Sequence, residues 1–276
     1  MSGTTTVNYV AQWNGSAWTA LSTGASGWVY SLATDGTDLY VGGQFASTGG
    51  VPANNIAKWN GASWSALGTG LANHVHALAF TPTQLIAGGD FTYSIATWNG
   101  TIFQFTNHHF DASNSTVLVT SLCIIGGDTY VGGVFTSIDG VPASNIAKWD
   151  GASWSPLGSG ANSSVQALAT DGVNLYVCGG FSVIGGITTQ AVAKWNGSLW
   201  SSIGGGIQGT GYDLIWVDGS LYVGGSFNTA GGVGNSAKMI AKWDGTSWSP
   251  LGNGLNSTIY ALAASGSDIY AGGEFT

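Results

Sequence analysis

One short pattern recurs six times along the chain, and this repeat limits the folds that the sequence can form. The pattern contains a Tyr-Val-Gly-Gly-x-Phe-like phrase and, later in each copy, an Ala-Lys-Trp-Asn-Gly-like phrase. The first phrase starts at Tyr40, Ile86, Tyr130, Tyr176, Tyr222 and Tyr270. The tryptophan of the second phrase is Trp13, Trp59, Trp98, Trp149, Trp195 or Trp243. The 276 residues divide into six copies of 46, a length at which one supersecondary unit must stack on its neighbours to bury its apolar faces.

Each copy predicts four short antiparallel strands. In the first copy, residues 29–33 and 39–41 are rich in β-branched and aromatic residues and flank an Asp-Gly dipeptide. Residues 55–59 and 63–67 flank an Asn-Gly dipeptide in the same way. Such dipeptides accept positive φ and favour tight hairpins. Apolar residues at helical spacing between caps do not occur, so we expect an all-β chain.

Four antiparallel strands in each repeat predict a six-bladed β-propeller that forms a single domain over residues 1–276. Most copies place the tryptophan 14 residues after the phenylalanine, and joining Phe275 to Trp13 through the chain ends gives the same step. We therefore expect two strands from each end to complete the last blade, which would leave no open sheet edge. The expected blades are about 28–67, 74–105, 117–157, 164–203, 211–251, and 258–276 with 7–21.

The paired aromatic residues of each copy are expected to form the core. Trp59 and Trp64 are one such pair, and in the second copy the pair is Trp98 and Phe103. Each large aromatic side chain buries about 150–250 Å², so these residues dominate the apolar contacts between blades. Cys123 and Cys178 stand where other copies have small residues. We expect two buried thiols there, and a disulfide between neighbouring blades is the alternative.

The charge of the chain excludes several classes of partner. The net charge is −8, and the positive residues are five lysines. Nucleic acids and anionic membranes both require a basic surface, so neither is expected as a partner. The sequence contains no run of about 18 apolar residues that would insert into a membrane, and it shows no signal peptide. The low charge and the abundance of Gly, Asn, Ser and Thr favour an extracellular, cell-surface or virion-surface protein. We expect a monomeric domain without a cofactor.

The repeat also resembles a known family. Tyr40-Val41-Gly42-Gly43, followed by Trp64-Ser65-Ala66-Leu67, is similar to the kelch-type repeat, and every copy carries both elements or close variants. The Ala-Lys-Trp-Asn-Gly phrase and the scarcity of charged loops resemble more closely the Trp- and Gly-rich propeller repeats of bacterial surface and secreted proteins. The resemblance implies a six-bladed propeller. It implies no activity, because this fold carries enzymes, lectins and protein-interaction domains alike.

Positions that vary between copies predict a ligand site at the mouth of the central channel. The residue after the Gly-Gly pair, the second residue of the first strand and the residues just before that strand vary most. Aromatic rings among amides and carboxylates at such positions suit a polar, uncharged ligand such as a sugar. The alternative is a water-filled channel with polar walls. The predicted ligand-binding residues are Trp28, Tyr30, Gln44, His74, His76, Asp90, Gln166, Tyr212, Asp213, Ser226, Tyr260 and Glu274.

The second copy departs most from the pattern. Its loop from Phe91 to Trp98 spans 7 residues instead of 14, and a longer segment with His108 and His109 follows Phe105. His74, His76 and Asp90 are weak candidates for a metal site, because imidazole and carboxylate suit zinc, copper or nickel. Their spacing matches no known metal motif. A loop decoration or a partner contact is the alternative.

These observations lead to three hypotheses for function. The first is a non-catalytic binding or adhesion domain that uses the variable loop face for a glycan or a protein partner. The second is a structural or protein-interaction scaffold, such as a surface or virion component. The third is a hydrolase or lyase that uses Asp90, Asp213 or Glu274, since glycoside cleavage needs paired carboxylates. No catalytic residue is assigned.

Overall fold

The structure is a computed structural model that describes residues 8–13, 18–113, 117–232 and 234–276. The chain divides into two compact units. Unit 1 is Met1–His109 with Thr116–Val119, and unit 2 is Phe110–Ser115 with Thr120–Thr276. The described residues contain strands and no helix, so the all-β prediction is confirmed and no helix in this part of the chain could span a membrane.

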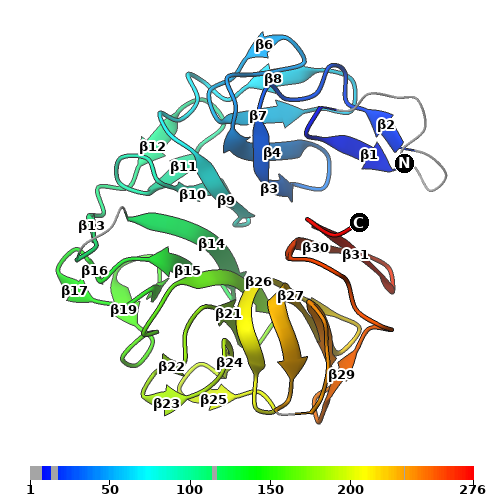
Figure 1. Cartoon of the computed structure of the whole chain (residues 1–276). Helices are drawn as coiled ribbons and strands as arrows, with labels where there is room; N and C mark the ends of the chain where they lie inside the picture. The colour runs from blue at the N-terminus through cyan, green and yellow to red at the C-terminus, as the bar shows by residue number, and fades with distance from the viewer. Residues whose placement is uncertain (1–7, 14–17, 114–116, 233) are drawn as a thin grey trace. The chain divides into compact units, whose positions relative to one another are not determined.

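Unit 1 contains two four-stranded antiparallel sheets, drawn in blue and cyan in Figure 1. The first has the order β3 (Trp28–Thr34), β4 (Leu39–Gln44), β7 (Ile56–Trp59) and β8 (Trp64–Ala66). The second consists of β9 (Val75–Phe80), β10 (Leu85–Gly89), β11 (Ile95–Trp98) and β12 (Phe103–Phe105). Two hairpins complete the unit: β1 (Ala11–Trp13) with β2 (Trp18–Ala20), and β5 (Ser47–Thr48) with β6 (Val51–Pro52).

Unit 2 repeats the same arrangement in three four-stranded sheets. The first is β14 (Leu118–Ile125, which begins in unit 1), β15 (Asp128–Val134), β18 (Ile146–Trp149) and β19 (Trp154–Pro156). The second is β20 (Val165–Thr170), β21 (Leu175–Gly179), β24 (Val192–Trp195) and β25 (Trp200–Ser202). The third is β26 (Ile207–Val217), β27 (Ser220–Ala230), β28 (Ile240–Trp243) and β29 (Trp248–Pro250). The smaller sheets are β13 (Phe110–Asp111) with β16 (Ser137–Ile138) and β17 (Val141–Pro142), β22 (Val183–Ile184) with β23 (Ile187–Thr188), and β30 (Ile259–Ser265) with β31 (Asp268–Gly273).

Side-chain hydrogen bonds fix the tight turns that the sequence predicts. In the turn between β7 and β8, Asn60 Oδ1 accepts hydrogen bonds from the N–H groups of Ala62 (3.0 Å) and Ser63 (2.8 Å). Gly61 takes a φ of 91°, which a residue without a Cβ adopts at little cost. The same bonds recur at Asp150, Asn196 and Asp244. The Asn-Gly and Asp-Gly dipeptides therefore set the register of the third and fourth strands.

The tryptophan pairs lie between neighbouring sheets, as expected for core residues. Trp64, Trp154, Trp200 and Trp248 are buried, and their partners across the turn are half-buried. Three of these indoles also link adjacent repeats: Trp64 Nε1 donates to the carbonyl oxygen of Leu21 at 2.7 Å, and Trp200 and Trp248 repeat this bond. Trp18 departs from the expectation, with 45% of its surface exposed. The side chain of Trp13 lies outside the described part of the chain.

A second set of links joins the first strands of neighbouring repeats in alternating fashion. Ser31 Oγ accepts the N–H of Leu78 at 3.0 Å, and Ser121 Oγ accepts that of Leu168 at 3.0 Å. Asp213 takes the same position in the fifth repeat, and its Oδ2 accepts the N–H of Leu262 at 2.7 Å. The intervening repeats have Ala77, Ala167 and Ala261 there. The links therefore occur in every second repeat.

Two expectations about the chain have different outcomes. Cys123 and Cys178 are free, buried thiols, so the alternative of a disulfide between them is wrong. Burial raises the pKa of the Cys123 thiol to about 12 and raises that of Cys178 as well. In contrast, closure of a sixth blade from both chain ends stays a prediction. β1–β2 and β30–β31 are two-stranded sheets in different units, and residues 7 and 14–17 of that expected blade lie outside the described residues.

Candidate functional site

A β-bulge near the start of the first strand positions the most variable side chain of the repeat. In β3, Val29 pairs with Gly43 and Ser31 pairs with Gly42, so the intervening Tyr30 is an extra residue. A bulge bends its strand and redirects the side chain that it carries. The same register shift occurs in β9, β20, β26 and β30, where the extra residues are His76, Gln166, Tyr212 and Tyr260. These are predicted ligand-binding residues.

The second glycine of the Gly-Gly pair makes this bulge possible. A Cβ on Gly43 would overlap the carbonyl oxygen of Trp28 and lie 2.9 Å from Cα of Val29. Gly89, Gly179, Gly225 and Gly273 are in the same situation in their repeats. The glycine is therefore required because the two backbones approach closely, and the residue after it lies beside the bulge. In the first repeat that residue is Gln44 of β4, which pairs with Trp28 of β3.

In unit 1, the structure brings six of the predicted residues together, and we call them the aromatic–histidine cluster. The rings of Tyr30 and His76 are stacked, with centroids 4.9 Å apart and planes 9° from parallel. Trp28 meets the edge of Tyr30 at a centroid distance of 6.3 Å, and Tyr30 Oη donates to Gln44 Oε1 at 3.1 Å. The cluster consists of Trp28, Tyr30, Gln44, His74, His76 and Asp90.

The rings of this cluster are open to solvent, although its histidine side is partly buried. Trp28 is 63% exposed and Tyr30 is 39% exposed, whereas His74, His76 and Asp90 are each half-buried. Burial lowers the pKa of the His76 imidazole, and the His74 ring lowers it further against the opposing effect of Asp90. His76 is therefore a neutral imidazole near pH 7, which can both donate and accept a hydrogen bond.

The carboxylate of Asp90 has one paired and one unpaired oxygen. Oδ2 lies 3.2 Å from Nδ1 of His74, whereas the buried Oδ1 has no hydrogen-bond partner within the described structure. One donor atom from each of His74, His76 and Asp90 lies within 4.8 Å of the other two. Tetrahedral donors at about 2.1 Å from a common zinc ion are about 3.4 Å apart, so these atoms would have to move closer by up to about 1.4 Å to complete such a site. Among the residues that the structure describes, these three form the group that could hold a metal ion.

A smaller cluster of the same kind occurs in unit 2. The rings of Tyr212 and Tyr260 have centroids 5.3 Å apart. Tyr260 Oη donates to Glu274 Oε1 at 2.9 Å, which repeats the bond between Tyr30 and Gln44 in equivalent positions. That bond is the main reason why the pKa of Tyr260 is raised. Half of the Tyr260 surface is exposed, so this pair also offers an aromatic face beside a polar acceptor.

The remaining predicted residues of unit 2 have other partners in the described part of the chain. Gln166 Nε2 donates to Ser164 Oγ at 3.2 Å, and Ser226 is an exposed residue of β27 paired with Thr210. Asp213 accepts hydrogen bonds from the N–H groups of Leu214 and Leu262 with its two oxygens. Burial raises the pKa of this carboxyl group to about 6, against the lowering effect of the two hydrogen bonds. Its carboxylate thus serves a link between strands.

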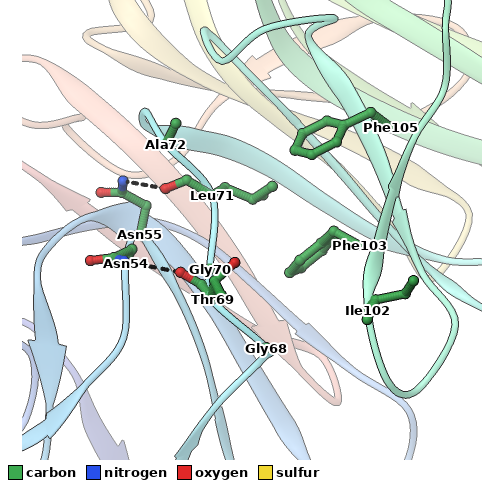
Figure 2. A pocket seen from close by; sticks show the side chains of 10 residues that line it. All are labelled: Asn54, Asn55, Gly68, Thr69, Gly70, Leu71, Ala72, Ile102, Phe103 and Phe105. Carbon is green, nitrogen blue, oxygen red and sulfur yellow. Dashed lines mark hydrogen bonds between the residues drawn. The ribbon is translucent and has the colours of Figure 1, made fainter.

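The structure also contains a groove that the sequence did not predict, and we call it the β12 groove (Figure 2). Its volume is about 690 Å³, and it lies within unit 1 between the segment before β9 and the strand β12. Asn54 and Asn55 support one wall by donating to the carbonyl oxygens of Thr69 and Leu71, both at 2.9 Å. The short loop of the second copy was the signal for it. The lining residues are Asn54, Asn55, Gly68, Thr69, Gly70, Leu71, Ala72, Ile102, Phe103 and Phe105.

Comparisons with known proteins agree with the repeated sheets. The model of the family described as "Rax2 C-terminal beta propeller domain" matches residues 19–170, more than half of the chain. The crystal structure of the computationally designed Ika8 protein is similar with a TM-score of 0.58 and 17% identity, over 91% of this chain and 69% of that chain. A structure of YCF48 bound to D1 peptide has a TM-score of 0.54 and 13% identity, over 90% and 75%. At these identities the likeness shows the fold alone. The comparison with curated proteins gives no match.

Proposed function

Because the chain belongs to the Rax2 C-terminal β-propeller domain family, we propose that it is a non-catalytic binding domain whose ligand site is the aromatic–histidine cluster. The exposed ring pair of Trp28 and Tyr30, set among hydrogen-bonding side chains, is the observation that carries the proposal. The proposed ligand is a polar, uncharged ring such as the sugar of a glycan.

The chemistry of the cluster supports this class of ligand. A sugar presents C–H groups on one face and hydroxyl groups around its edge, so it needs an aromatic surface and nearby donors and acceptors. Trp28 and Tyr30 supply the surface. Gln44 and the neutral His76 supply the polar groups. The Tyr212–Tyr260 pair with Glu274 offers a second place of similar composition.

A glycan array with the intact chain tests the proposal, followed by titration of the best sugar against variants. Trp28→Ala and Tyr30→Ala each remove one ring of the site, and we expect affinity at least about tenfold lower for each. Tyr270→Ala is the matched control, since Tyr270 is 42% exposed but lies on β31 outside the cluster. Failure of every sugar to bind, or equal losses in the control, would refute a glycan site.

A divalent transition-metal ion is the second candidate ligand of this cluster. The three donor atoms of His74, His76 and Asp90 and the unpaired buried carboxylate oxygen favour it. Calorimetric titration with Zn²⁺ and Ni²⁺ should then give one site per chain that His76→Ala abolishes and His109→Ala retains. Binding that is equal in these two variants would remove the metal from consideration.

A protein partner is the second candidate function. YCF48, which is similar in fold to this chain, is bound to a peptide in its solved structure.

The proposal further includes the six-bladed arrangement, the kelch-like type of the repeat and an extracellular or surface setting. The 14-residue step that the two chain ends share and the low content of charged residues support these points.

A further inference from the structure

In four of the other repeats, a hairpin between the second and third strands covers the segment that precedes the first strand. Ala25 pairs with Thr48 of the β5–β6 hairpin, and Ala161 pairs with Ile184 of β22–β23. Phe110 pairs with Ile138 and Ile207 pairs with Ala230 in the third and fifth repeats. The four hairpin residues are fully buried. The chain therefore adds a short strand of its own to this segment in four repeats.

Backbone hydrogen bonds hold these added strands. In the first repeat, the N–H of Gly49 donates to the carbonyl oxygen of Gly24 at 2.7 Å, and the N–H of Ser26 donates to that of Ser47 at 2.9 Å. In the fourth repeat, the N–H of Gly185 donates to Gly160 at 2.8 Å, and that of Asn162 donates to Val183 at 3.0 Å. Each segment thus gives one acceptor and one donor to its hairpin.

The second repeat has the segment but not the hairpin. Only residues 90–94 separate β10 from β11, so no two-stranded hairpin forms there. Gly70 and Leu71 nevertheless keep the supporting bonds of the other repeats: the N–H of Gly70 donates to Leu67 at 3.0 Å and that of Leu71 to Asn54 at 3.0 Å. The carbonyl oxygen of Gly70 and the N–H of Ala72 have no hydrogen-bond partner among the described residues. They are the groups that pair with the hairpin elsewhere.

The side-chain space of the missing hairpin is also open. In the first and fourth repeats, the hairpin glycines Gly49 and Gly185 lie so close to Trp64 and Trp200 that an added Cβ would overlap the indole ring. In the second repeat the smaller Phe103 replaces this tryptophan. The β12 groove occupies the resulting space, and Ile102 (56% exposed) and Phe105 (43% exposed) form its outer wall (Figure 2).

We propose that the β12 groove binds an extended peptide segment of a partner protein by β-strand addition to Gly70–Ala72. The backbone of the peptide would donate to the carbonyl oxygen of Gly70 and accept from the N–H of Ala72. The internal strands indicate its sequence: the residue opposite Leu71 is small or β-branched, as Thr48, Ile138, Ile184 and Ala230 are. In the same four hairpins the next residue has positive φ, and it is glycine in three of them and Asp139 in the other.

A synthetic peptide that copies residues 182–190 of this chain, the β22–β23 hairpin region, is a suitable probe. We expect it to bind the intact chain and to protect the Ala72 amide from hydrogen exchange. Substituting the isoleucine that copies Ile184 by aspartate should abolish binding, because that side chain enters the apolar groove. An Ala72 amide that exchanges equally fast with and without saturating peptide would overturn the proposal.

Two variants locate the site. Ile102→Asp should weaken peptide binding at least tenfold, whereas Leu199→Asp should not, because Leu199 is the equivalent turn residue in a repeat whose hairpin is present. Both residues are exposed, so both variants should fold. Equal effects of the two aspartates, or self-association of the chain through this groove in place of peptide binding, would overturn the proposal. Trp28→Ala, which tests the glycan site, should leave peptide binding unchanged.

Discussion

The carboxyl group of Asp213 should make unit 2 less stable at neutral pH than at acidic pH. Its pKa is raised from 3.8 to about 6 by burial, so the folded chain retains a proton that the unfolded chain releases between these values. Because the folded state binds more protons in that window, the free energy of unfolding falls as the pH rises from about 4 to 6 and changes no further above it. A shift of about two pKa units corresponds to up to about 3 kcal/mol.

Asp213→Ser isolates this effect. Serine occupies the equivalent positions 31 and 121, where its Oγ accepts the corresponding N–H at 3.0 Å, so the variant should keep the link to Leu262. It loses the hydrogen bond to Leu214, which costs about 1 kcal/mol. We therefore expect the variant to be about 2 kcal/mol more stable than the wild type at pH 8, and to have lost this advantage near pH 4.

Urea unfolding followed by tryptophan fluorescence at several pH values measures this difference. Asp244→Asn is the control, because hydrogen bonds from Thr246 and Ser247 lower the pKa of that exposed carboxyl group. Asp244 therefore adds to the free energy of unfolding above its unfolded pKa, and this contribution is lost as the pH falls. This pH dependence is opposite in sign to that of Asp213. A wild-type-to-variant difference for Asp213→Ser that stays constant from pH 4 to 8 would refute the reasoning.

Two further predictions concern packing. Gly43→Ala should lower the free energy of unfolding by more than about 2 kcal/mol, because the new methyl group overlaps the carbonyl oxygen of Trp28. The control Gly180→Ala should be tolerated, because its nearest contact would be at 3.6 Å. Equal melting temperatures of the two variants would contradict the role of the bulge. Cys123 and Cys178 should not react with a thiol reagent at pH 8 until the chain unfolds, because burial raises both pKa values and blocks access; rapid labelling of the native chain would contradict their placement.

The turns and strands could be predicted because local chemistry determines them. Asn60-Gly61 favours a hairpin wherever it occurs between strands, and the structure has one there. The position shared by Tyr30 and His76 could also be found, because six copies of one unit show which residue varies. The stacking of the two rings could not, because it depends on a bulge that shifts the register by one residue.

Other features depend on what a residue faces, which the repeat does not reveal. Asp213 follows a variable position and is one of the predicted ligand-binding residues, and in the structure its two oxygens accept backbone N–H groups. The β12 groove was missed although both of its causes are visible in the sequence. The short loop and the replacement of tryptophan by Phe103 are far apart in the chain, and only the fold shows that they open the same space.

The alternation of Ser31, Ala77, Ser121, Ala167, Asp213 and Ala261 has a consequence for how such a chain can change in length. The bonds from Ser31 to Leu78, from Ser121 to Leu168 and from Asp213 to Leu262 tie the repeats into couples, and the first couple lies in unit 1 and the other two in unit 2. Deleting or duplicating one repeat would separate an acceptor from its donor, whereas doing so with two at a time would preserve every tie. Shortened or extended versions of this protein should therefore be cut between couples, and natural relatives should gain or lose repeats in even numbers.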